Sequence, residues 1–213
     1  MSNIIKLLIL LAVVICILVL SILYFKKLYE VPEGDDFMGA EIIRIYTEEM
    51  PATRFIGKKY FMEDRENGSF SSKWGEWFQN GWFEIIEKQS DQDLSQWFVE
   101  GGAYIGLERL KENEPFEYYI GIFMPEGTPV PAGFEALDFP ASLLGVGWIK
   151  GTMENIFIWE EIRDRLILEG YKPVADEQDA LWSFERYTCP RFTDPDEDGN
   201  IILDYGYFLE FKP

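Results

Sequence analysis

The chain has 213 residues, with 19 basic and 38 acidic side chains and a formal net charge of -19. A nucleic-acid backbone has to be met by lysine and arginine, so this balance argues against direct binding to DNA or RNA. Histidine is absent, which removes the commonest general base and zinc ligand, and every serine–histidine or cysteine–histidine pair.

The first predicted element is a hydrophobic helix from Leu7 to Phe25, which contains no charge, proline or glycine. Roughly 19 residues at about 1.5 Å each span about 28 Å, close to the hydrocarbon thickness of a bilayer. A cleaved signal peptide would have a shorter apolar part and end in small residues, whereas this run ends in Tyr-Phe-Lys-Lys. We therefore expect residues 1–27 to be a single-pass membrane anchor.

A short linker at residues 28–39, with proline, glycine and acids, is expected to lead into one domain at residues 40–213. Lys6 lies on one side of the anchor and Lys26-Lys27 on the other, so the positive-inside rule nearly balances. This leaves the orientation open, with a slight preference for a cytoplasmic C-terminal domain. Cys16 lies in the anchor and Cys189 in the domain, so no disulfide is expected between them.

The predicted domain repeats one pattern of elements, in which extended stretches precede an amphipathic helix and two strands follow it. In the first copy the patterning predicts strands at 41–47, 51–57, 104–109 and 116–123 and a helix at 73–88. In the second copy it predicts strands at 134–138, 140–146, 181–186 and 203–209 and a helix at 158–170. Pro-Ala-[Ser/Thr] and Glu-Arg recur in the same order in both copies, which favours duplication over chance similarity between two aromatic-rich halves.

This order of elements predicts an α+β fold. Two strand-helix-strand-strand halves would each form an antiparallel sheet and pair around a pseudo-twofold axis. The crevice between the halves is then the expected place for a ligand.

Residues 40–211 resemble the GyrI-like effector-binding domains, also called bacterial transcription-activator effector-binding domains. The resemblance rests on Phe139–Ala141 with Gly145–Gly147, Trp159-Glu160, Phe184–Tyr187 and Asp204–Leu209. These domains occur in gyrase-inhibitory proteins and as ligand-sensing modules of multidrug-responsive regulators, so the resemblance implies small-molecule binding. A hydrophobic segment, and no helix-turn-helix, precedes the domain, so DNA-binding output is not expected.

Glu185 is the main candidate ligand-binding residue. In the family that this chain resembles, the glutamate of the Phe-Glu-x-Tyr stretch points into an aromatic pocket between the halves, and Glu185 occupies that position. Strand alternation places Ser183, Glu185 and Tyr187 on one face and Trp182, Phe184 and Arg186 on the other. The alternative is a strand glutamate that pairs with a neighbouring arginine.

Four further residues complete the candidate ligand-binding set: Tyr187, Trp148, Glu108 and Tyr104. Glu108 is the counterpart of Glu185 in the first copy, and symmetry alone supports it. Tyr104 shares a face with Glu108 but suits the core better. Trp148 follows Gly145-Val146-Gly147, where absent side chains could leave room for a ligand; ordinary packing is the alternative.

Residues 194–200 nearly match a calcium loop, with acids at positions 1, 3 and 5 and glycine at position 6. Position 12, which should supply a bidentate glutamate, is Tyr205. A polar hairpin turn accounts for the whole segment. We therefore predict neither a metal site nor a cofactor.

The sequence predicts a membrane-anchored binding protein for a cationic or amphipathic hydrophobic small molecule, held by Glu185 and surrounding rings. The expected partners are that ligand and a lipid bilayer, through residues 7–25. Two alternatives remain open. The acidic surface could dock a basic protein, or Glu185 could act as the general base of a hydrolase for strained electrophiles.

Overall fold

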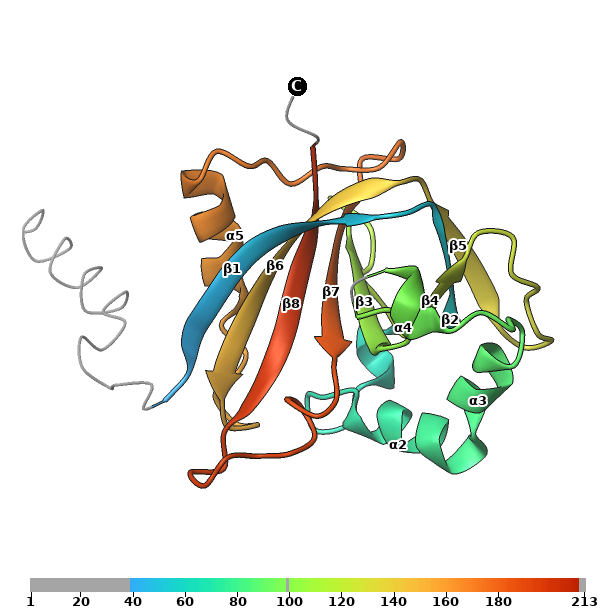
Figure 1. Ribbon diagram of the computed structural model, residues 1–213, viewed down its shortest axis with the longest axis horizontal. Coiled ribbons are helices and arrows are strands. Elements are labelled where there is room, and N and C mark those ends of the chain that lie inside the picture. Colours follow the sequence, from blue (N-terminus) through green and yellow to red (C-terminus); the bar gives the residue numbers. More distant parts are fainter. Residues whose placement is uncertain (1–38, 99, 211–213) are drawn as a thin grey trace, which may run out of the picture. The chain divides into compact units, whose positions relative to one another are not determined.

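The computed structural model describes residues 39–98 and 100–210 (Figure 1). The predicted anchor at 7–25 and nearly all of the predicted linker lie outside these residues. None of the helices within the described ranges is both long and apolar enough to cross a membrane.

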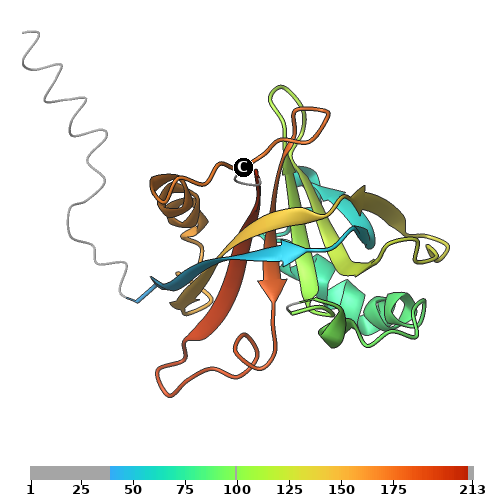
Figure 2. The same cartoon turned by 45° about the horizontal axis from the view of Figure 1, so that its top comes forward.

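The strands have the following bounds: β1 (Glu41–Met50), β2 (Thr53–Phe61), β3 (Tyr104–Leu110), β4 (Glu117–Pro125), β5 (Glu135–Phe139), β6 (Ser142–Gly151), β7 (Leu181–Tyr187) and β8 (Ile201–Leu209). They form one antiparallel sheet in the order β1-β6-β8-β7-β3-β4-β2-β5. The sheet is strongly twisted, so that β1 and β6 cross the direction of β7 (Figure 2). The predicted α+β class with antiparallel pairing is therefore confirmed.

The strand order is symmetric about the contact between β3 and β7. Exchanging β1 with β5, β6 with β2, β8 with β4 and β7 with β3 reproduces the same order. Because β1 pairs with β6 and β5 pairs with β2, each copy contributes its first strand to the half-sheet of the other. The prediction of two separate sheets is wrong, because β3 of the first copy pairs with β7 of the second and joins the two halves into one sheet. Without this pairing, β3 and β7 would each leave an unpaired backbone edge at the centre of the domain.

The helices are a 3-10 turn η1 (Met62–Asp64), α2 (Ser71–Asn80), α3 (Trp82–Glu87), α4 (Leu94–Trp97) and α5 (Trp159–Leu168). The single helix predicted at 73–88 is wrong, because the chain breaks between α2 and α3 at Gly81, where φ is +61°. Glycine adopts this left-handed conformation without steric cost. The second predicted helix ends as expected, just before Gly170 with φ +82°.

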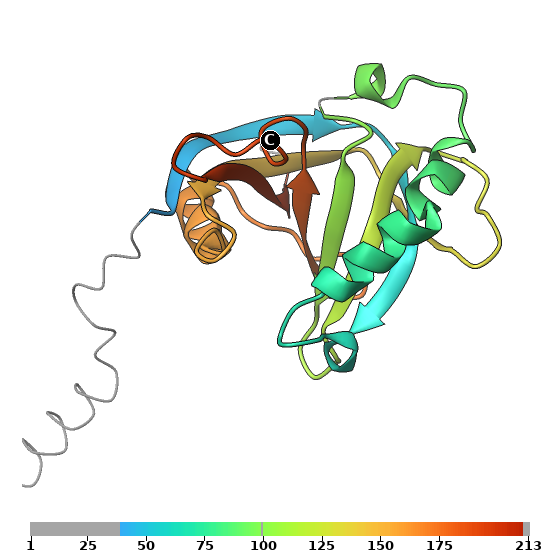
Figure 3. The same ribbon diagram turned by 90° about the horizontal axis from the view of Figure 1, so that it is seen from below.

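Helices cover one face of the sheet in two separate places (Figure 3). Trp77, Phe83 and Ile86 of α2 and α3 pack on the half that contains β4. Ile162 and Leu166 of α5 pack on the half that contains β8. The opposite face carries its own hydrophobic core, made by Met50, Phe55, Ile105, Leu107, Tyr119, Phe123, Leu144, Val146, Trp182, Phe184 and Phe208. The central strands β3 and β7 therefore lie between two helical covers.

Candidate ligand-binding site

Glu185 lies on β7 at the centre of the sheet, on the helix-covered face, with 8% of its surface exposed. Its Oε2 atom accepts hydrogen bonds from the hydroxyls of Tyr118 and Tyr187, each at 2.7 Å. Among residues 39–98 and 100–210, no group donates a hydrogen bond to its Oε1 atom. One oxygen of the carboxyl group is thus fixed, and the other is left for a further partner.

Aromatic rings surround this carboxyl group. Phe70 stacks on Tyr118 with ring centroids 4.3 Å apart. Trp74 of α2 meets Tyr187 at 4.5 Å, and its indole N–H donates to the Tyr118 hydroxyl at 3.1 Å. Phe192 lies edge-on against Tyr187 at 4.6 Å. The carboxyl group is therefore enclosed by rings from α2, β4, β7 and the segment that follows β7.

Gly106 on β3 lies directly opposite Glu185 in the strand register. A Cβ atom at this position would lie 2.2 Å from the Tyr118 hydroxyl oxygen and 2.7 Å from Glu185 Oε2. The hydrogen bond between Tyr118 and Glu185 therefore occupies space that any other residue at position 106 would fill. Here glycine is required for the close approach of two side chains.

Glu108 forms a second carboxyl centre on the same face. Its Oε2 atom accepts hydrogen bonds from Ser183 Oγ at 2.8 Å and from the Tyr205 hydroxyl. Tyr205 lies opposite Glu185 on β8, as Tyr118 lies opposite Glu108 on β4. The two centres are thus built alike, with a tyrosine from one copy donating to the glutamate of the other.

Burial and, to a smaller extent, the charge of Glu108 raise the pKa of Glu185 to about 7, against the opposing hydrogen bonds from Tyr118 and Tyr187. Burial also raises the pKa of Glu108, although Tyr205 and Ser183 donate to it. Removing a carboxylate from water disfavours its charged form. Near neutral pH, Glu185 is therefore close to the midpoint of its titration.

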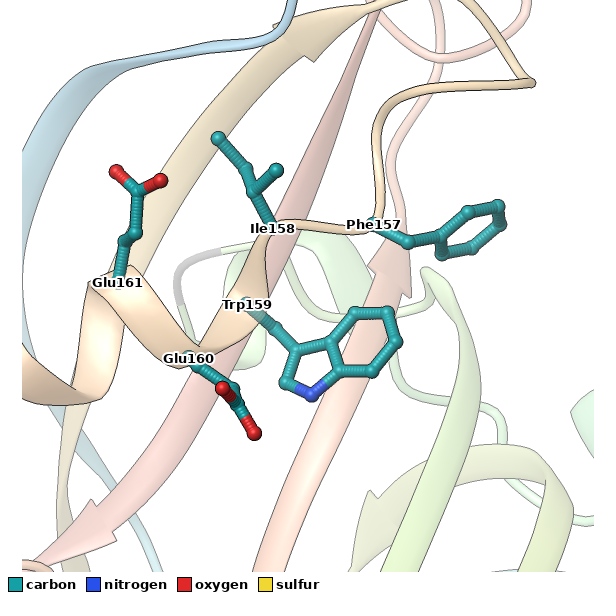
Figure 4. Close-up of a pocket in the computed structure, with 5 residues that line it drawn as sticks. All are labelled: Phe157, Ile158, Trp159, Glu160 and Glu161. Carbon is teal, nitrogen blue, oxygen red and sulfur yellow. The ribbon is translucent and has the colours of Figure 1, made fainter. Parts of the chain in front are cut away.

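A surface pocket of about 340 Å³ lies at the start of α5, lined by Phe157, Ile158, Trp159, Glu160 and Glu161 (Figure 4). Trp159 is 37% exposed and stacks on Tyr205 with ring centroids 6.1 Å apart. The hydroxyl of Tyr205 in turn donates to Glu108. The pocket is therefore adjacent to the Glu108 centre, and it combines exposed rings with two acidic side chains.

The structure brings four of the sequence-predicted residues onto the helix-covered face: Glu185, Tyr187, Glu108 and Tyr104. The predicted sharing of one face by Ser183, Glu185 and Tyr187 agrees with these contacts. Tyr104 stacks on Phe83 at 3.6 Å, within the core beneath α3, and makes no contact with either carboxyl group among the described hydrogen bonds. Burial, together with the nearby Glu87, raises the pKa of Tyr104 to about 12.

Trp148 lies on the opposite face of the sheet from Glu185. Its ring contacts Tyr46 and lies 4.5 Å from the Arg191 guanidinium carbon. The expectation that its glycine neighbours leave room for a ligand is wrong. Leu166 of α5 fills the space beside Gly145, and Ile162 fills the space beside Gly147. The small residues allow close packing of a helix on the strand.

The alternative interpretation of Glu185, an ion pair with a neighbouring arginine, does not match the geometry of the described residues. Arg186 points to the other face, where it pairs with Glu48 at 2.5 Å and Asp204 at 3.0 Å. Arg191 also pairs with Asp204. The partners of Glu185 are tyrosine hydroxyls, which leave its charge without a neutralising group.

Sequence reasoning missed Tyr118, Tyr205, Trp74 and Trp159. The two tyrosines lie in the aromatic closing strands predicted at 116–123 and 203–209, so the sequence predicted that they belong to strands. It did not predict the face of the sheet to which they point, because the neighbouring tyrosines at 118 and 119 fit either register equally. The helix positions of the two tryptophans indicated an inward face, but not which strand residues they would meet.

Comparison with protein families finds one match over most of the chain. The model of the Cass2 family, described as integron-associated effector binding protein, matches residues 47–205. No match to a curated protein is found.

Several solved structures share the fold at low sequence identity. The structure of SAV2435 bound to tetraphenylphosphonium has a TM-score of 0.54 and 14% identity, and covers 79% of this chain and 94% of that one. The EcmrR–DNA complex has a TM-score of 0.51 and 13% identity, and the match covers 91% of this chain and 64% of that one. The EcmrR C-terminal domain has a TM-score of 0.50 and 12% identity, and the match covers 79% of this chain and 98% of that one. These likenesses show the fold.

Proposed function

Because the chain belongs to the Cass2 family of integron-associated effector binding proteins, we propose that it binds hydrophobic organic cations at Glu185. Effector binding is the function that the family indicates. The observation that supports a cationic ligand is a buried carboxyl group that is enclosed by rings and forms no ion pair with any described residue. Such rings attract a cation through their faces and cover its apolar body.

The similar structure of SAV2435 adds support, because it is described as bound to tetraphenylphosphonium. This ion is a delocalised cation with four phenyl groups and no hydrogen-bond donor. An acid flanked by Phe70, Trp74, Tyr118 and Tyr187 offers the matching charge and apolar surface. Tetraphenylphosphonium is therefore a suitable first probe for this chain.

Membrane attachment forms the second part of the proposal. The uncharged run from Leu7 to Phe25 supports an anchor that keeps the binding domain at a bilayer surface. Hydrophobic cations concentrate at bilayers, so a tethered domain would meet them there. Resistance of the full chain to alkaline carbonate extraction is the expected result; release into the soluble fraction would contradict the anchor. Protease protection in sealed vesicles would then test the slight preference for a cytoplasmic domain.

The test of cation binding is a titration of the full chain in lipid nanodiscs with tetraphenylphosphonium, followed by tryptophan fluorescence. Trp74 contacts both tyrosines of the Glu185 centre, so binding should change its emission. Glu185→Gln is expected to weaken binding by about 10- to 100-fold, the factor that one charge contact contributes.

Glu112→Gln is the matched control, since Glu112 is exposed in the turn after β3 and the variant loses the same charge. This control should bind as the unaltered chain does. Equal weakening in both variants would mean that net charge, and not the Glu185 centre, attracts the cation. Unaltered binding in Glu185→Gln would refute the proposed site.

A further inference from the structure

Two carboxyl groups lie close together on the helix-covered face. In the register of β3 and β7, Gly106 faces Glu185 and Glu108 faces Ser183. Glu185 and Glu108 are therefore diagonal neighbours on one face of an antiparallel pair. Side chains in this relation have Cβ atoms roughly 7 Å apart or slightly less.

Both carboxyl groups are held in the same manner. Each uses Oε2 to accept two hydroxyl hydrogen bonds, from Tyr118 and Tyr187 at Glu185 and from Ser183 and Tyr205 at Glu108. Neither Oε1 atom receives a hydrogen bond from any residue that the structure describes. Each fixed carboxyl group thus has one oxygen that accepts no hydrogen bond from the described residues.

No ion pair within the described ranges neutralises either group. Arg186, which is buried, and Arg191, which is partly buried, are bound to acids on the opposite face. The charge of Glu108 acts on Glu185 strongly enough to raise its pKa. A ligand with a single positive charge would relieve only part of this repulsion, whereas two positive centres would relieve it at both acids.

The Glu108 centre also has an aromatic neighbour of its own. Trp159 stacks on Tyr205. Trp159 also lines the surface pocket (Figure 4). Glu160 lines the same pocket. Each carboxyl centre therefore combines an acid, a tyrosine and a tryptophan: Glu185 with Tyr118 and Trp74, and Glu108 with Tyr205 and Trp159.

We propose that the preferred ligand is an organic dication, with one positive centre against Glu185 and the other against Glu108 and Trp159. This inference rests on the proposed function, since it assigns a ligand class to the same site. The Glu185 centre is enclosed beneath Trp74, and the Glu108 centre is adjacent to the open pocket. A ligand with two charged ends joined by an apolar spacer fits this pair of environments.

The experiment compares hexamethonium, which carries two trimethylammonium groups, with hexyltrimethylammonium, which has the same spacer and a single charge. Both are titrated by calorimetry into the full chain in lipid nanodiscs. The dication is expected to bind about 10- to 100-fold more tightly, the factor for one additional charge contact. Glu108→Gln should remove this preference, whereas Glu185→Gln should weaken the binding of both probes. Glu112→Gln should alter neither.

Equal affinities for the two probes, or a preference that survives in Glu108→Gln, would overturn the dication inference while the proposed function stands. The proposed function would instead be refuted if the monocation does not bind, or if its affinity is the same for Glu185→Gln as for the unaltered chain. Near-ultraviolet circular dichroism checks that each variant is folded.

Discussion

The two carboxyl centres occupy equivalent places in the two halves of the domain, yet their surroundings differ. At Glu185 the residue on the facing strand is Gly106, and Tyr118 fills the space that a side chain would take. At Glu108 the facing residue is Ser183, whose hydroxyl replaces one tyrosine as a donor. One centre is therefore closed by aromatic packing, and the other is more polar and lies beside an open pocket.

The helices that cover the two centres also differ, since the tryptophan over Glu185 is more buried than the tryptophan near Glu108. Trp74 of α2 is partly buried and contacts both tyrosines of the Glu185 centre. Trp159 of α5 is partly exposed and covers Tyr205 at a greater separation. A duplicated frame can thus give two acids different degrees of burial through the residue opposite each one and the tryptophan above it. The strand register is the same around Glu185 and Glu108. The difference in burial between the two carboxyl groups therefore comes from the neighbouring side chains.

The largest expected effect concerns the pH dependence of stability. Because the folded-state pKa of Glu185 is about 7, above its ordinary value of 4.5, the unfolded chain loses this proton first as pH rises. The Glu185 contribution to stability is therefore full below about pH 4.5 and is lost as pH rises through about 7. Its loss is on the order of 3 kcal/mol at most, for a shift of about two pH units or slightly more. The titratable groups that face Glu185 are Tyr118, Tyr187, Tyr205 and Glu108.

The measurement is the free energy of unfolding in urea at pH 5 and pH 8, for the unaltered chain and for Glu185→Gln. Other acids titrate in both proteins, so the difference between the two proteins isolates Glu185. We expect Glu185→Gln to gain stability relative to the unaltered chain as pH rises. A difference that is constant across this range would mean that Glu185 is already ionised at pH 5, and the contrast in burial between the two centres would be lost.

A smaller effect is expected from filling the space that distinguishes the two centres. In Gly106→Ala the new methyl group would overlap the Tyr118 hydroxyl and Glu185 Oε2, and overpacking of this kind costs about 2 kcal/mol. Ser183→Ala, the matched change at the other centre, removes the hydroxyl that donates to Glu108 and accepts from Tyr205, and should cost about 1 kcal/mol. Urea unfolding measures both values. Equal costs would show that Tyr118 moves aside freely.

The smallest effect should come from removing single hydroxyl donors. Tyr118→Phe deletes the donor to Glu185 and the acceptor of the Trp74 indole N–H, at a cost of about 1 kcal/mol. Since the lost hydrogen bond favoured the charged carboxylate, the pKa of Glu185 should rise further. Tetraphenylphosphonium binding, which needs that carboxylate, should then shift its pH midpoint upward. Tyr205→Phe, its counterpart, should leave this midpoint nearly unchanged; equal shifts in both would remove the distinction between the centres.

Much of the fold could be predicted from hydrophobic patterning. The strands predicted at 104–109 and 181–186 are observed at Tyr104–Leu110 and Leu181–Tyr187. Their alternation also placed Ser183, Glu185 and Tyr187 on one face. Two of the failures had signals in the sequence. Asn80-Gly81 is a typical helix break, and Trp148 has the opposite strand parity to Gly145 and Gly147, so it had to lie on the other face.

The remainder depends on pairing between distant segments. The exchange of first strands between the copies depends on which strand edges pair, and the hydrophobic pattern of a single segment does not predict this. The donors from Tyr118 and Tyr205 cross from one copy to the other, so their roles appear only once β4 and β8 are placed beside β3 and β7. The repeat predicted that Glu108 and Glu185 occupy equivalent positions in the two copies. It could not predict that they lie close together, because that depends on the pairing of β3 with β7.

The exchange of first strands has a consequence for how the domain assembles. Ile45 pairs with Gly147 and Phe55 pairs with Leu137, so neither copy completes its own part of the sheet. A chain that ended after the first copy would lack the partner of β1 and the strand that covers β2, and two such chains would have to interlock as a dimer to restore both. Contacts of this sequence separation also make folding slow, so the acid pair should form late, once nearly the whole chain has been synthesised.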